Sequence, residues 1–324
     1  METRVICIRE CGGPEVLRWE TMEVAPPGAG EVLVKNRAIG LNFIDVYHRT
    51  GRYKAKLPFV PGLEGAGIVE AVGHDVTNVK VGDRVGYIDP IGAYAEKLIR
   101  PALRLIKLPD NVSEHAAAAM LLKGMTAEYL IRRTYPVKAG EVILIHAAAG
   151  GVGQILCQWA KHLGAIVIAT VGSRAKRTIA EQLGCDHVIV TGEEDFVARV
   201  RAITDGKGVP VVYDGVGADT FRGSLNCLSP LGMMVTFGNA SGPIPPFDVQ
   251  VLASKGSLFL TRPGIAAYTA TPESLNESAA RLFSVLEKGA VKIDTQQRYA
   301  LRDAARAHSD LEARKLTGST LLLP

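Results

Sequence analysis

The sequence predicts an α/β protein in which a doubly wound, six-stranded parallel sheet is inserted into a β-rich, partly open barrel. Three observations predict this: short apolar runs between turn residues fill 1–100, strands and helices alternate from about residue 140, and the alternation stops after 262. Strict alternation gives a parallel sheet with right-handed crossovers. The expected domains are 1–122, a barrel; 123–262, the parallel-sheet domain; and 263–324, a segment that returns to the barrel.

The first hundred residues contain short apolar runs bounded by Gly, Pro and Asp. The expected strands are Val5–Ile8, Glu31–Ala38, Gly67–Val72, Asp83–Tyr87 and Ala93–Ile99. Gly12-Gly13-Pro14 and Pro26-Pro27-Gly28 are turn signals between them. The Ala-rich segment Ser113–Leu122 predicts a helix with a Ser N-cap.

The pattern changes at Val142–His146, a nearly all-apolar run that suits a strand buried on both faces. The later strands expected are Ile166–Thr170, His187–Val190, Pro210–Asp214, Gly232–Phe237 and Ser257–Thr261. The helices expected are Gly153–Leu163, Ala175–Leu183, Glu194–Thr204 and Asp219–Leu228. Six such strands make a doubly wound dinucleotide-binding sheet. A helix over Thr271–Lys288 and a short tail follow; because they cannot form a core alone, we expect the tail to return to the first domain.

Composition excludes several classes of protein. Of 324 residues, 47% are hydrophobic and 22% charged, as in ordinary soluble domains. The net charge of +4 is scattered, which disfavours a basic arm for nucleic acid. The first residues, Met1–Ile6, lack the pattern of a secretory signal, and no uncharged apolar run reaches about 18 residues, so we expect neither a signal segment nor a membrane span. The five cysteines are odd in number and widely spaced, so we expect reduced thiols in a cytoplasmic protein.

The central motif is Ala147-Ala148-Ala149-Gly150-Gly151-Val152-Gly153, between a buried strand and a helix. A dinucleotide pyrophosphate needs exposed backbone amides and the positive end of a helix, with no Cβ in the way. Gly150 and Gly151 allow close approach, and Gly153 lets the helix pack on the strand. We expect the bare amides of residues 150–153 to bind the diphosphate. A plain tight turn is the alternative, but four further strand–helix units favour nucleotide binding.

The end of the second strand predicts the nucleotide. A carboxylate that would bind the ribose diol of NAD is absent, and Ser173, Arg174, Lys176 and Arg177 stand there instead. These side chains favour a 2′-phosphate, so we expect NADPH rather than NADH. A solvated basic first turn of a helix is the alternative.

No metal site is expected. Cys7 and Cys11 lie near the start of the chain, far from His48 and His74, and none has ligand spacing. Without zinc to polarise a carbonyl, an acceptor that is already electrophilic, such as a quinone or an enone, suits the chain.

Several motifs together resemble the zinc-free quinone oxidoreductases, the zeta-crystallin-like branch of the medium-chain dehydrogenase/reductase superfamily, over essentially the full length. They are Gly12–Leu17, Gly40–Tyr47, Pro61–Gly67, His146–Gly153 and Val212–Gly217. The resemblance implies a GroES-like first domain, a Rossmann sheet, NADPH and a homodimer. The zinc enzymes of the superfamily have Cys where Asn42 stands and His where Leu63 stands, which supports a metal-free site; Glu64 would be a structural or ion-paired acid.

The resemblance also implies the site residues. The turn Phe43–Tyr47 after Asn42, with Ile44 and Asp45, would line the cleft beside the nicotinamide, and Ala148 would lie with the glycines at the pyrophosphate. Thr126 and Tyr129 would contact the cofactor, Ser173 and Lys176 the 2′-phosphate. Phe237, Gly238, Asn239 and Arg262 would border the nicotinamide, and Arg314 would close over the cofactor. Relatives often carry Tyr where Thr191 stands, so one contact is in doubt. Arg262 and Arg314 could instead form interdomain salt bridges.

We expect hydride transfer from NADPH to a quinone, with Asn42, Tyr47 and Tyr53 hydrogen-bonded to the acceptor oxygen. Water or a Tyr would supply the proton, and single-electron transfer stays open. The tyrosines could be rim aromatics, and Asn42 could cap a turn. An enone or enoyl reductase is the nearest rival; an RNA-binding or crystallin role and a methyltransferase are weaker ones. The hydrophobic edge Leu258–Leu260 of the last strand, Ser257–Thr261, predicts a homodimer.

Overall fold

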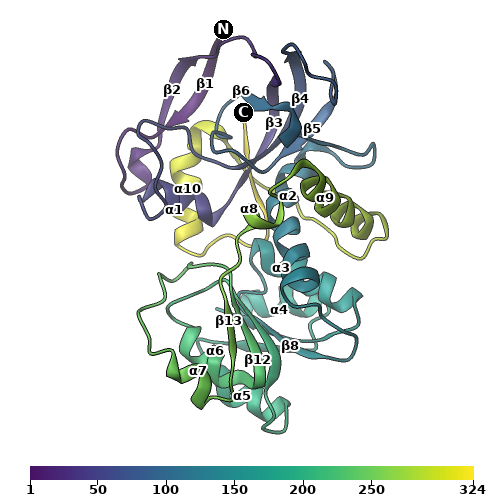
Figure 1. The fold of residues 1–324 in the computed structure, drawn as a ribbon. Coiled ribbons are helices and arrows are strands. Elements are labelled where there is room, and N and C mark those ends of the chain that lie inside the picture. Colours follow the sequence, from purple (N-terminus) through teal and green to yellow (C-terminus); the bar gives the residue numbers. More distant parts are fainter. The chain divides into compact units, whose positions relative to one another are not determined.

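The computed structural model describes residues 1–324 and divides them into two compact units. The first unit comprises Met1–Lys123, Thr271–Phe283 and Ile293–Pro324, and the second comprises Gly124–Ala270 and Ser284–Lys292. The second unit therefore interrupts the chain of the first (Figure 1). None of the helices combines the length and apolar character that a bilayer crossing needs.

The first unit is built on a seven-stranded sheet with the order β14-β15-β3-β4-β5-β7, to which β6 is added through β3. Its strands from the first part of the chain are β3 (Glu31–Leu41), β4 (Glu64–Val72), β5 (Arg84–Tyr87), β6 (Lys97–Pro101) and β7 (Ile106–Lys107). A separate antiparallel pair consists of β1 (Glu2–Cys7) and β2 (Arg18–Glu23). Because β2 is mostly exposed and rich in charge, it carries no apolar pattern and was not predicted.

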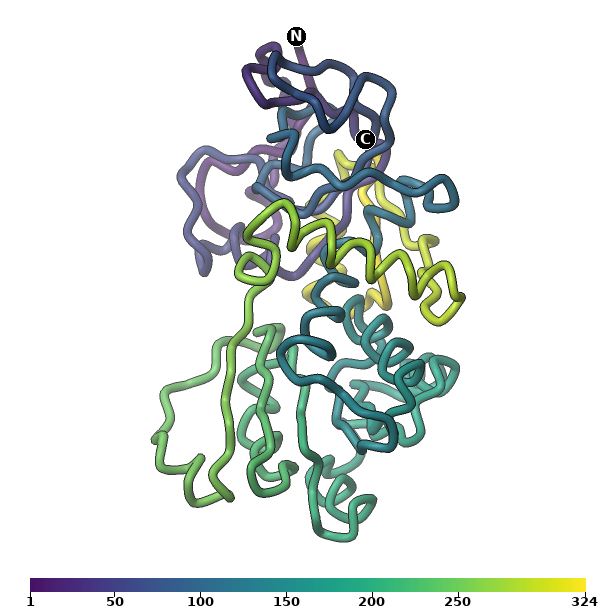
Figure 2. The backbone as a smooth tube through the Cα atoms, turned by 45° about the vertical axis from the view of Figure 1, so that its right-hand side comes forward, coloured from purple at the N-terminus to yellow at the C-terminus, as the bar shows by residue number.

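The end of the chain supplies two strands of this sheet. β15 (Thr320–Leu323) pairs antiparallel with β3, with Leu321 opposite Gly40, and β14 (Gln297–Ala300) pairs parallel with β15. In Figure 2 the yellow C-terminal segment runs among purple and blue N-terminal segments. Between these strands lies α10 (Ala304–Glu312). The sequence predicted only a tail here, because strands of four residues show no useful alternation.

The second unit contains a six-stranded sheet in which every pairing is parallel. Its order is β10-β9-β8-β11-β12-β13. The strands are β8 (Val142–Ile145), β9 (Ile166–Val171), β10 (His187–Val190), β11 (Val209–Asp214), β12 (Leu228–Thr236) and β13 (Phe259–Thr261). The chain starts in the middle and fills one side and then the other, so the predicted doubly wound fold class is confirmed.

The helices that connect these strands lie close to their predicted ranges. They are α3 (Gly151–His162), α4 (Arg174–Gln182), α5 (Phe196–Ile203) and α6 (Phe221–Cys227), with two short helices, α7 (Gln250–Ser254) and α8 (Ile265–Tyr268), that were not predicted. β12 begins at Leu228 rather than at Gly232, since its first residues pair with β11 before an irregularity in register.

Two long helices complete the chain. α2 (Glu114–Tyr129) is extended by a π-helical segment, η3 (Leu130–Thr134), and α9 covers Pro272–Glu287. The predicted cap is present, because Ser113 Oγ accepts a hydrogen bond from the amide of Ala116 at 3.1 Å. The predicted end of this helix at Leu122 is wrong, since buried residues such as Met125 continue its apolar contacts beyond that point.

The edge strand β13 differs from its prediction. Of the three residues expected to form an exposed hydrophobic edge, only Phe259 is more than half exposed, at 55%. Leu258 is buried in the core of this unit with Val209 and Met234, and Leu260 is partly buried against the same cluster. The edge predicted at Leu258 is therefore wrong, because that side chain points into the core.

Candidate active site

The turn between β8 and α3 is a candidate phosphate site. Ala147 has a left-handed backbone (φ 53°), which costs a residue with a side chain roughly 1 kcal/mol. A Cβ on Gly153 would lie 2.3 Å from the oxygen of Ala147, so only glycine fits where the helix meets the turn. The amides of Gly151, Val152 and Gly153 lie in the first turn of α3, where a helix has no acceptors of its own for them, so they can bind an anion.

Two predicted binding residues have occupied amides. The amide of Gly150 donates to the oxygen of Ala147 at 2.9 Å, and that of Ala148 donates to the oxygen of Thr170 at 3.0 Å. The expectation of bare amides from residue 150 onward is therefore wrong at Gly150. The reason is that the tight turn uses this amide to close.

The end of β9 carries the basic residues predicted for a 2′-phosphate. Ser173 is the N-cap residue of α4, and its side chain makes no capping hydrogen bond. Arg174 pairs with Glu193 at 2.8 Å, and Arg177 pairs with Glu181 at 3.1 Å. The cluster that includes Lys176 is therefore partly neutralised by two carboxylates.

The turns after β11 and β12 pack together. The amide of Phe237 donates to the oxygen of Asp214 at 2.8 Å, and a Cβ on Gly238 would lie 2.4 Å from the oxygen of Gly215. The ring of Phe237 covers Gly215, and Asn239 backs onto Gly217. The structure thus brings together Phe237, Gly238 and Asn239 at the end of the sheet where the turn between β8 and α3 also lies.

Thr126, Tyr129 and Arg262 interact within the second unit. Burial raises the pKa of Tyr129 far above its usual value, while Arg262 and the hydroxyl of Thr126 act in the opposite direction. The ring of Tyr129 stacks on that of Tyr268, with centroids 4.3 Å apart and planes at 11°. Stacking and burial therefore hold the Tyr129 ring in place beside Thr126 and Arg262.

A helix replaces the turn predicted at Phe43–Tyr47. This helix, α1 (Phe43–Arg49), follows Asn42 as its N-cap residue, and the carboxylate of Asp45 accepts the amide of Asn42 at 2.9 Å. The turn prediction was wrong because a seven-residue helix shows too little periodicity to reveal itself. Phe43 and Ile44, both predicted to line the site, are half-buried in its first turn.

Asn42 is held by a buried ion pair. Its Nδ2 donates to Glu64 Oε2 at 2.9 Å and to the oxygen of Gly40 at 3.2 Å. The same Glu64 oxygen accepts Lys123 Nζ at 3.0 Å, and Oε1 accepts the amide of Leu122 at 2.7 Å. Both amide hydrogens of Asn42 are therefore engaged, which makes Asn42 a poorer donor to an acceptor molecule than predicted.

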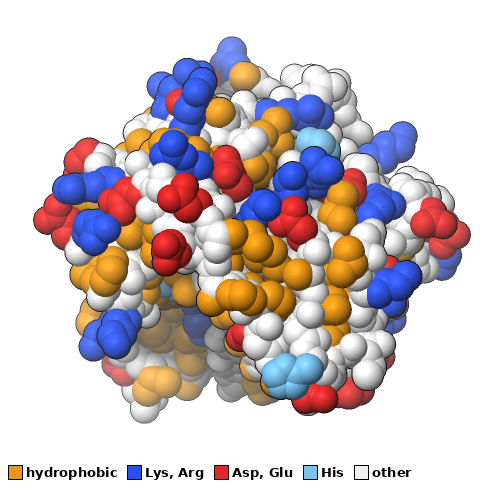
Figure 3. Space-filling model, turned by 90° about the horizontal axis from the view of Figure 1, so that it is seen from above, with side chains coloured by type: hydrophobic (Ala, Val, Ile, Leu, Met, Phe, Trp, Pro, Cys, Tyr) orange, Lys and Arg blue, Asp and Glu red, His pale blue; other side chains and the backbone are white.

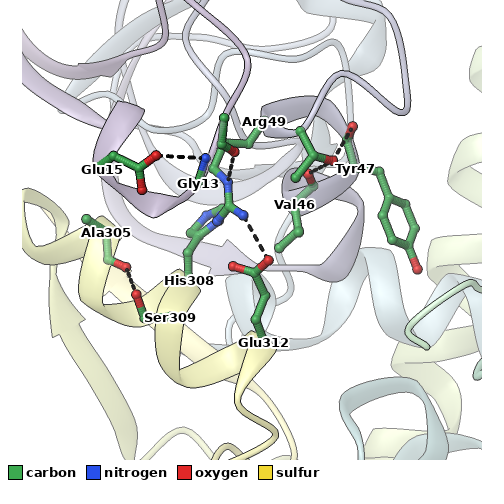
Figure 4. A network of polar contacts seen from close by, with 11 residues as sticks. Gly13, Glu15, Val46, Tyr47, Arg49, Ala305, His308, Ser309 and Glu312 are labelled. Atoms are coloured by element: carbon green, nitrogen blue, oxygen red, sulfur yellow. Dashed lines mark hydrogen bonds and ion pairs between the residues drawn. The ribbon is translucent and has the colours of Figure 1, made fainter. Parts of the chain in front are cut away.

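Asp45 begins a chain of polar contacts that crosses the first unit. Its Oδ2 accepts Tyr94 Oη at 2.9 Å, and Tyr94 Oη contacts His308 Nε2 at 3.0 Å. His308 Nδ1 faces Arg49 Nη1 at 3.2 Å, and Arg49 Nη2 donates to Glu312 Oε1 at 2.8 Å. Figure 4 shows Arg49 reaching toward His308 and Glu312 of α10. This chain links the helix beside Asn42 to the tail of the sequence.

Burial dominates the ionisation of this chain. Burial raises the pKa of Asp45 to about 7, against hydrogen bonds from Asn42 and Tyr94 that lower it. Burial and then the nearby Arg49 lower the pKa of His308 to about 3. Asp45 Oδ1 is buried without a hydrogen-bond partner. Asp45 can therefore exchange a proton near neutral pH, and His308 stays neutral.

Tyr47 and Tyr53 form one aromatic cluster. Their ring centroids are 5.2 Å apart in an edge arrangement, and the amide of Tyr53 donates to the oxygen of Tyr47 at 2.9 Å. Arg52 lies over the Tyr47 ring at 5.1 Å, and Phe43 lies 6.1 Å away on the other turn of α1. Tyr47 is buried and Tyr53 is half-buried. The structure therefore brings the two tyrosines into contact with each other, and both follow Asn42 closely in the sequence.

Arg314 is exposed, and the possible metal ligands lie apart from one another. Arg314 follows α10 with a left-handed backbone (φ 58°) and is exposed. No group of three or more His, Cys, Asp or Glu side chains lies close enough to hold a metal ion. All five cysteines are free thiols, of which Cys11 is exposed and Cys7, Cys157 and Cys227 are buried.

Sequence reasoning missed Lys123, Tyr94 and His308. Each lies far along the chain from its polar partner, so no local spacing signals the pair. Lys123 alone gave a usable signal, because a Lys inside an apolar helix segment needs a buried acid.

A GroES-like first part and a doubly wound nucleotide sheet define a medium-chain dehydrogenase/reductase. A model described as an alcohol dehydrogenase GroES-like domain matches residues 28–134, and one described as a zinc-binding dehydrogenase matches 151–281. A quinone oxidoreductase of Pseudomonas aeruginosa is 52% identical over 315 residues, 97% of each chain. The chain belongs to the quinone oxidoreductase family, as its zeta-crystallin-like motifs predicted.

Two further similarities bear on function. A crystal structure of an Escherichia coli quinone oxidoreductase complexed with NADPH has a TM-score of 0.97 at 48% identity, covering 99% of this chain and 100% of that one. A 2-haloacrylate reductase of a Burkholderia species is 44% identical over 325 residues, 98% of each chain.

Proposed function

We propose that this chain is an NADPH:quinone oxidoreductase that needs no metal. The observation that carries the proposal is the turn at the start of α3, where no Cβ fits at Gly153 and three first-turn amides have no acceptor within the helix and can bind an anion. Family membership over nearly the full length, together with the NADPH complex of a relative, supports the same conclusion.

The second unit would bind the nucleotide. Gly151, Val152 and Gly153 would donate to the pyrophosphate, while Ala148 would contribute only its position. The hydroxyl of Ser173 and the charge of Lys176 would hold the 2′-phosphate. Thr126, Tyr129, Phe237, Gly238, Asn239 and Arg262 would surround the nicotinamide end. When bound, the nicotinamide supplies a hydride.

The first unit would bind the acceptor. Tyr47 and Tyr53 are the better candidates to donate to a quinone oxygen, since both amide hydrogens of Asn42 are engaged. Asn42 would then orient the start of α1, with Phe43, Ile44 and Asp45. Holding donor and acceptor in place supplies about 7–11 kcal/mol in favourable cases. Arg314 would close over the cofactor, as the family resemblance implies.

The metal-free reaction follows from the same residues. Asn42 and Leu63 stand where zinc enzymes of the superfamily have ligands, and the amide of Asn42 is bonded to Glu64 instead. A quinone is electrophilic without a Lewis acid. The proton that accompanies the hydride would come from a tyrosine or from water.

A steady-state screen tests this function. Both nucleotides would be measured with a para-quinone, an ortho-quinone and a 2-alkenal. We expect a kcat/KM for NADPH at least about tenfold above that for NADH, since a 2′-phosphate contact is worth that much. Equal use of NADH would refute the cofactor assignment. Tyr47→Phe with Tyr53→Phe should slow turnover, whereas Tyr299→Phe is the control.

Enone reduction is the second candidate function, because a relative of 44% identity is a 2-haloacrylate reductase. Both reactions use the same hydride donor and differ in the acceptor. A higher kcat/KM for the alkenal or a haloacrylate than for every quinone would favour it.

RNA binding and a crystallin role have less support. On the face in Figure 3, Lys and Arg side chains are mixed with Asp, Glu and hydrophobic side chains rather than forming a stripe.

We propose that the protein is a homodimer formed through the edge strand β13 at Phe259, and that it is cytoplasmic with reduced thiols. Phe259→Lys should lower the mass measured by light scattering to that of a monomer; a wild-type monomer would refute the dimer.

A further inference from the structure

A buried chain of polar side chains lies under the strand ends of the second unit. His146 Nδ1 faces Thr170 Oγ1 at 2.8 Å, and His146 Nε2 faces Ser224 Oγ at 2.9 Å. Ser224 Oγ lies 3.1 Å from Asp214 Oδ2 and 2.9 Å from the oxygen of Thr220, either of which can accept its one hydrogen, and Thr220 Oγ1 donates to the same Asp214 oxygen at 2.7 Å. No polar atom of this chain lacks a partner.

The direction of each hydrogen bond follows from the chemistry of the groups. The one hydroxyl hydrogen of Ser224 points to a carboxylate or a carbonyl, and neither can donate back. His146 Nε2 must therefore carry the hydrogen and donate to Ser224. Its Nδ1 then accepts from the hydroxyl of Thr170, so His146 is a neutral Nε2–H tautomer.

The chain is not a hydrolytic triad, although it contains Ser, His and Asp. In a triad the His lies between Asp and Ser, but here Ser224 lies between Asp214 and His146. The five side chains are also sealed from solvent: His146 is 1% exposed, Thr170 2% and Thr220 7%, and Ser224 and Asp214 are fully buried. No substrate can reach them, so the role must be carried by what they hold in place.

Three members of the chain lie where a turn of the candidate nucleotide site begins, whereas Ser224 lies in α6 and Thr220 is the N-cap residue of that helix. His146 directly follows β8 and precedes Ala147, and Thr170 lies near the end of β9 before Ser173. Asp214 ends β11, and its Oδ1 accepts the amides of Val216 and Gly217 at 2.7 and 3.1 Å. The chain therefore connects the residues at which three turns begin.

Main-chain bonds join the same positions. The amide of His146 donates to the oxygen of Tyr213 at 3.0 Å, and the amide of Ala148 donates to the oxygen of Thr170 at 3.0 Å. The imidazole also meets the Phe196 ring edge-on, with centroids 5.1 Å apart. The hydrogen bonds and this aromatic contact hold the imidazole of His146 in one orientation.

We propose that His146 is a positioning residue. It fixes the positions of three turns relative to one another, namely the turn between β8 and α3, the Ser173 turn and the turn after Asp214, and so determines the affinity for the nucleotide. The inference rests on the proposed function, in which these three turns bind NADPH. The chain touches no reacting atom, so it acts on binding of the nucleotide and leaves the reaction rate of the bound complex unchanged.

Isosteric variants provide the test. Thr170→Val removes the hydroxyl that His146 accepts, and Thr236→Val is its matched control. Thr236 is also buried, lies at the end of β12 in the same sheet, and has a hydroxyl with no hydrogen-bond partner. We expect Thr170→Val to raise the Kd and KM for NADPH about tenfold, with kcat within about twofold, while Thr236→Val leaves all three unchanged.

Substitutions of the imidazole separate volume from hydrogen bonding. His146→Phe keeps a ring without polar atoms and should weaken NADPH binding as Thr170→Val does. His146→Gln keeps one acceptor and one donor and should recover most of the affinity. Equal affinity of Thr170→Val, Thr236→Val and wild type for NADPH would overturn the inference, whereas a wild type that binds no NADPH would refute the proposed function instead.

The wild-type protein gives a readout that needs no variant to fold. In a ¹⁵N nuclear magnetic resonance spectrum, His146 should be an Nε2–H tautomer at neutral pH, and its pKa should lie below the usual value of histidine because burial lowers it. An Nδ1–H tautomer or a raised pKa would contradict these hydrogen-bond directions.

Discussion

The two units each bury a chain of polar side chains, but the chains differ in charge. In the first unit, Asp45 and Arg49 are both buried, and Asp45 Oδ1 has no hydrogen-bond partner. In the second unit, the chain from Thr170 to Asp214 has a partner for every polar atom and contains one acid, which lies within hydrogen-bond distance of four donor groups. Buried polar groups cost little when satisfied and much when not.

This difference indicates which unit should change in stability with pH. A chain in which every polar atom has a partner fixes one geometry, as the proposed nucleotide site at the three turns requires. A chain with an unpaired carboxylate oxygen and a raised pKa can gain or lose a proton near neutral pH. We therefore expect pH sensitivity in the first unit and rigidity in the second.

The largest effect should come from Arg49→Leu. The Arg49 side chain is 1% exposed and donates to Glu312, to the oxygen of Gly12 and toward His308. Removing one member of a buried charge network costs about 3–5 kcal/mol, measured as the free energy of unfolding in urea. Arg18→Leu, which removes the exposed partner of Glu10, should leave stability unchanged. An equal effect of the two variants would remove the contrast between buried and exposed charges.

The pH dependence of stability gives a second, smaller effect. The pKa of Asp45 is raised from 3.8 to about 7 by folding, so the folded state binds its proton more tightly and stability falls as pH rises through that range. The pKa of His308 is lowered from 6.5 to about 3, so stability falls as pH drops below 6.5. Lys123 and Glu64 also act on Asp45, in opposite directions. The two contributions oppose each other in the wild type.

Asp45→Asn should break this balance. The amide keeps an oxygen to accept Tyr94 and places a neutral group at the unpaired position. Relative to wild type, the variant should gain stability as pH rises from about 4 to 7, by an amount of a few kcal/mol. Urea midpoints at three pH values measure it. Ser224→Ala should instead shift stability by a constant amount between pH 5 and 8; parallel curves for Asp45→Asn would refute the assignment.

Sequence reasoning found the parts of the fold that repeat. The alternation from Val142 to Asp214 predicted strands nearly to the residue, because buried parallel strands are short apolar runs bounded by turns. It missed β14, β15 and α1, whose patterns are too short. It placed Gly153 correctly at a position where no side chain fits.

The chains of polar contacts could not be predicted. His308 and Asp45 meet through Tyr94 only because the tail folds back on β3, and no spacing in the sequence encodes that encounter. Similarly, the amide of Gly150 was assigned to the ligand because a motif names residues but not hydrogen bonds. The amide of Gly150 reaches the oxygen of Ala147 because Ala147 has a positive φ, which the sequence does not reveal.

The smallest effect should appear at the exposed rim of the second unit, where charge is neither buried nor fixed. Glu193 holds Arg174, whose side chain is 83% exposed, and both lie beside the Ser173 turn. Exposed pairs contribute about 0–1 kcal/mol and are screened by salt.

Glu193→Gln should therefore lower the KM for NADPH by no more than about threefold, because Arg174 is released toward the 2′-phosphate and a repelling charge is lost. The KM for NADH should stay constant, and the difference should vanish in high salt. Glu181→Gln, which frees Arg177 further along α4, is the matched control and should change less. A change of the same size with NADH would mean that Glu193 acts on the β9–α4 turn itself, in which case even this rim would share the rigidity of the chain beneath it.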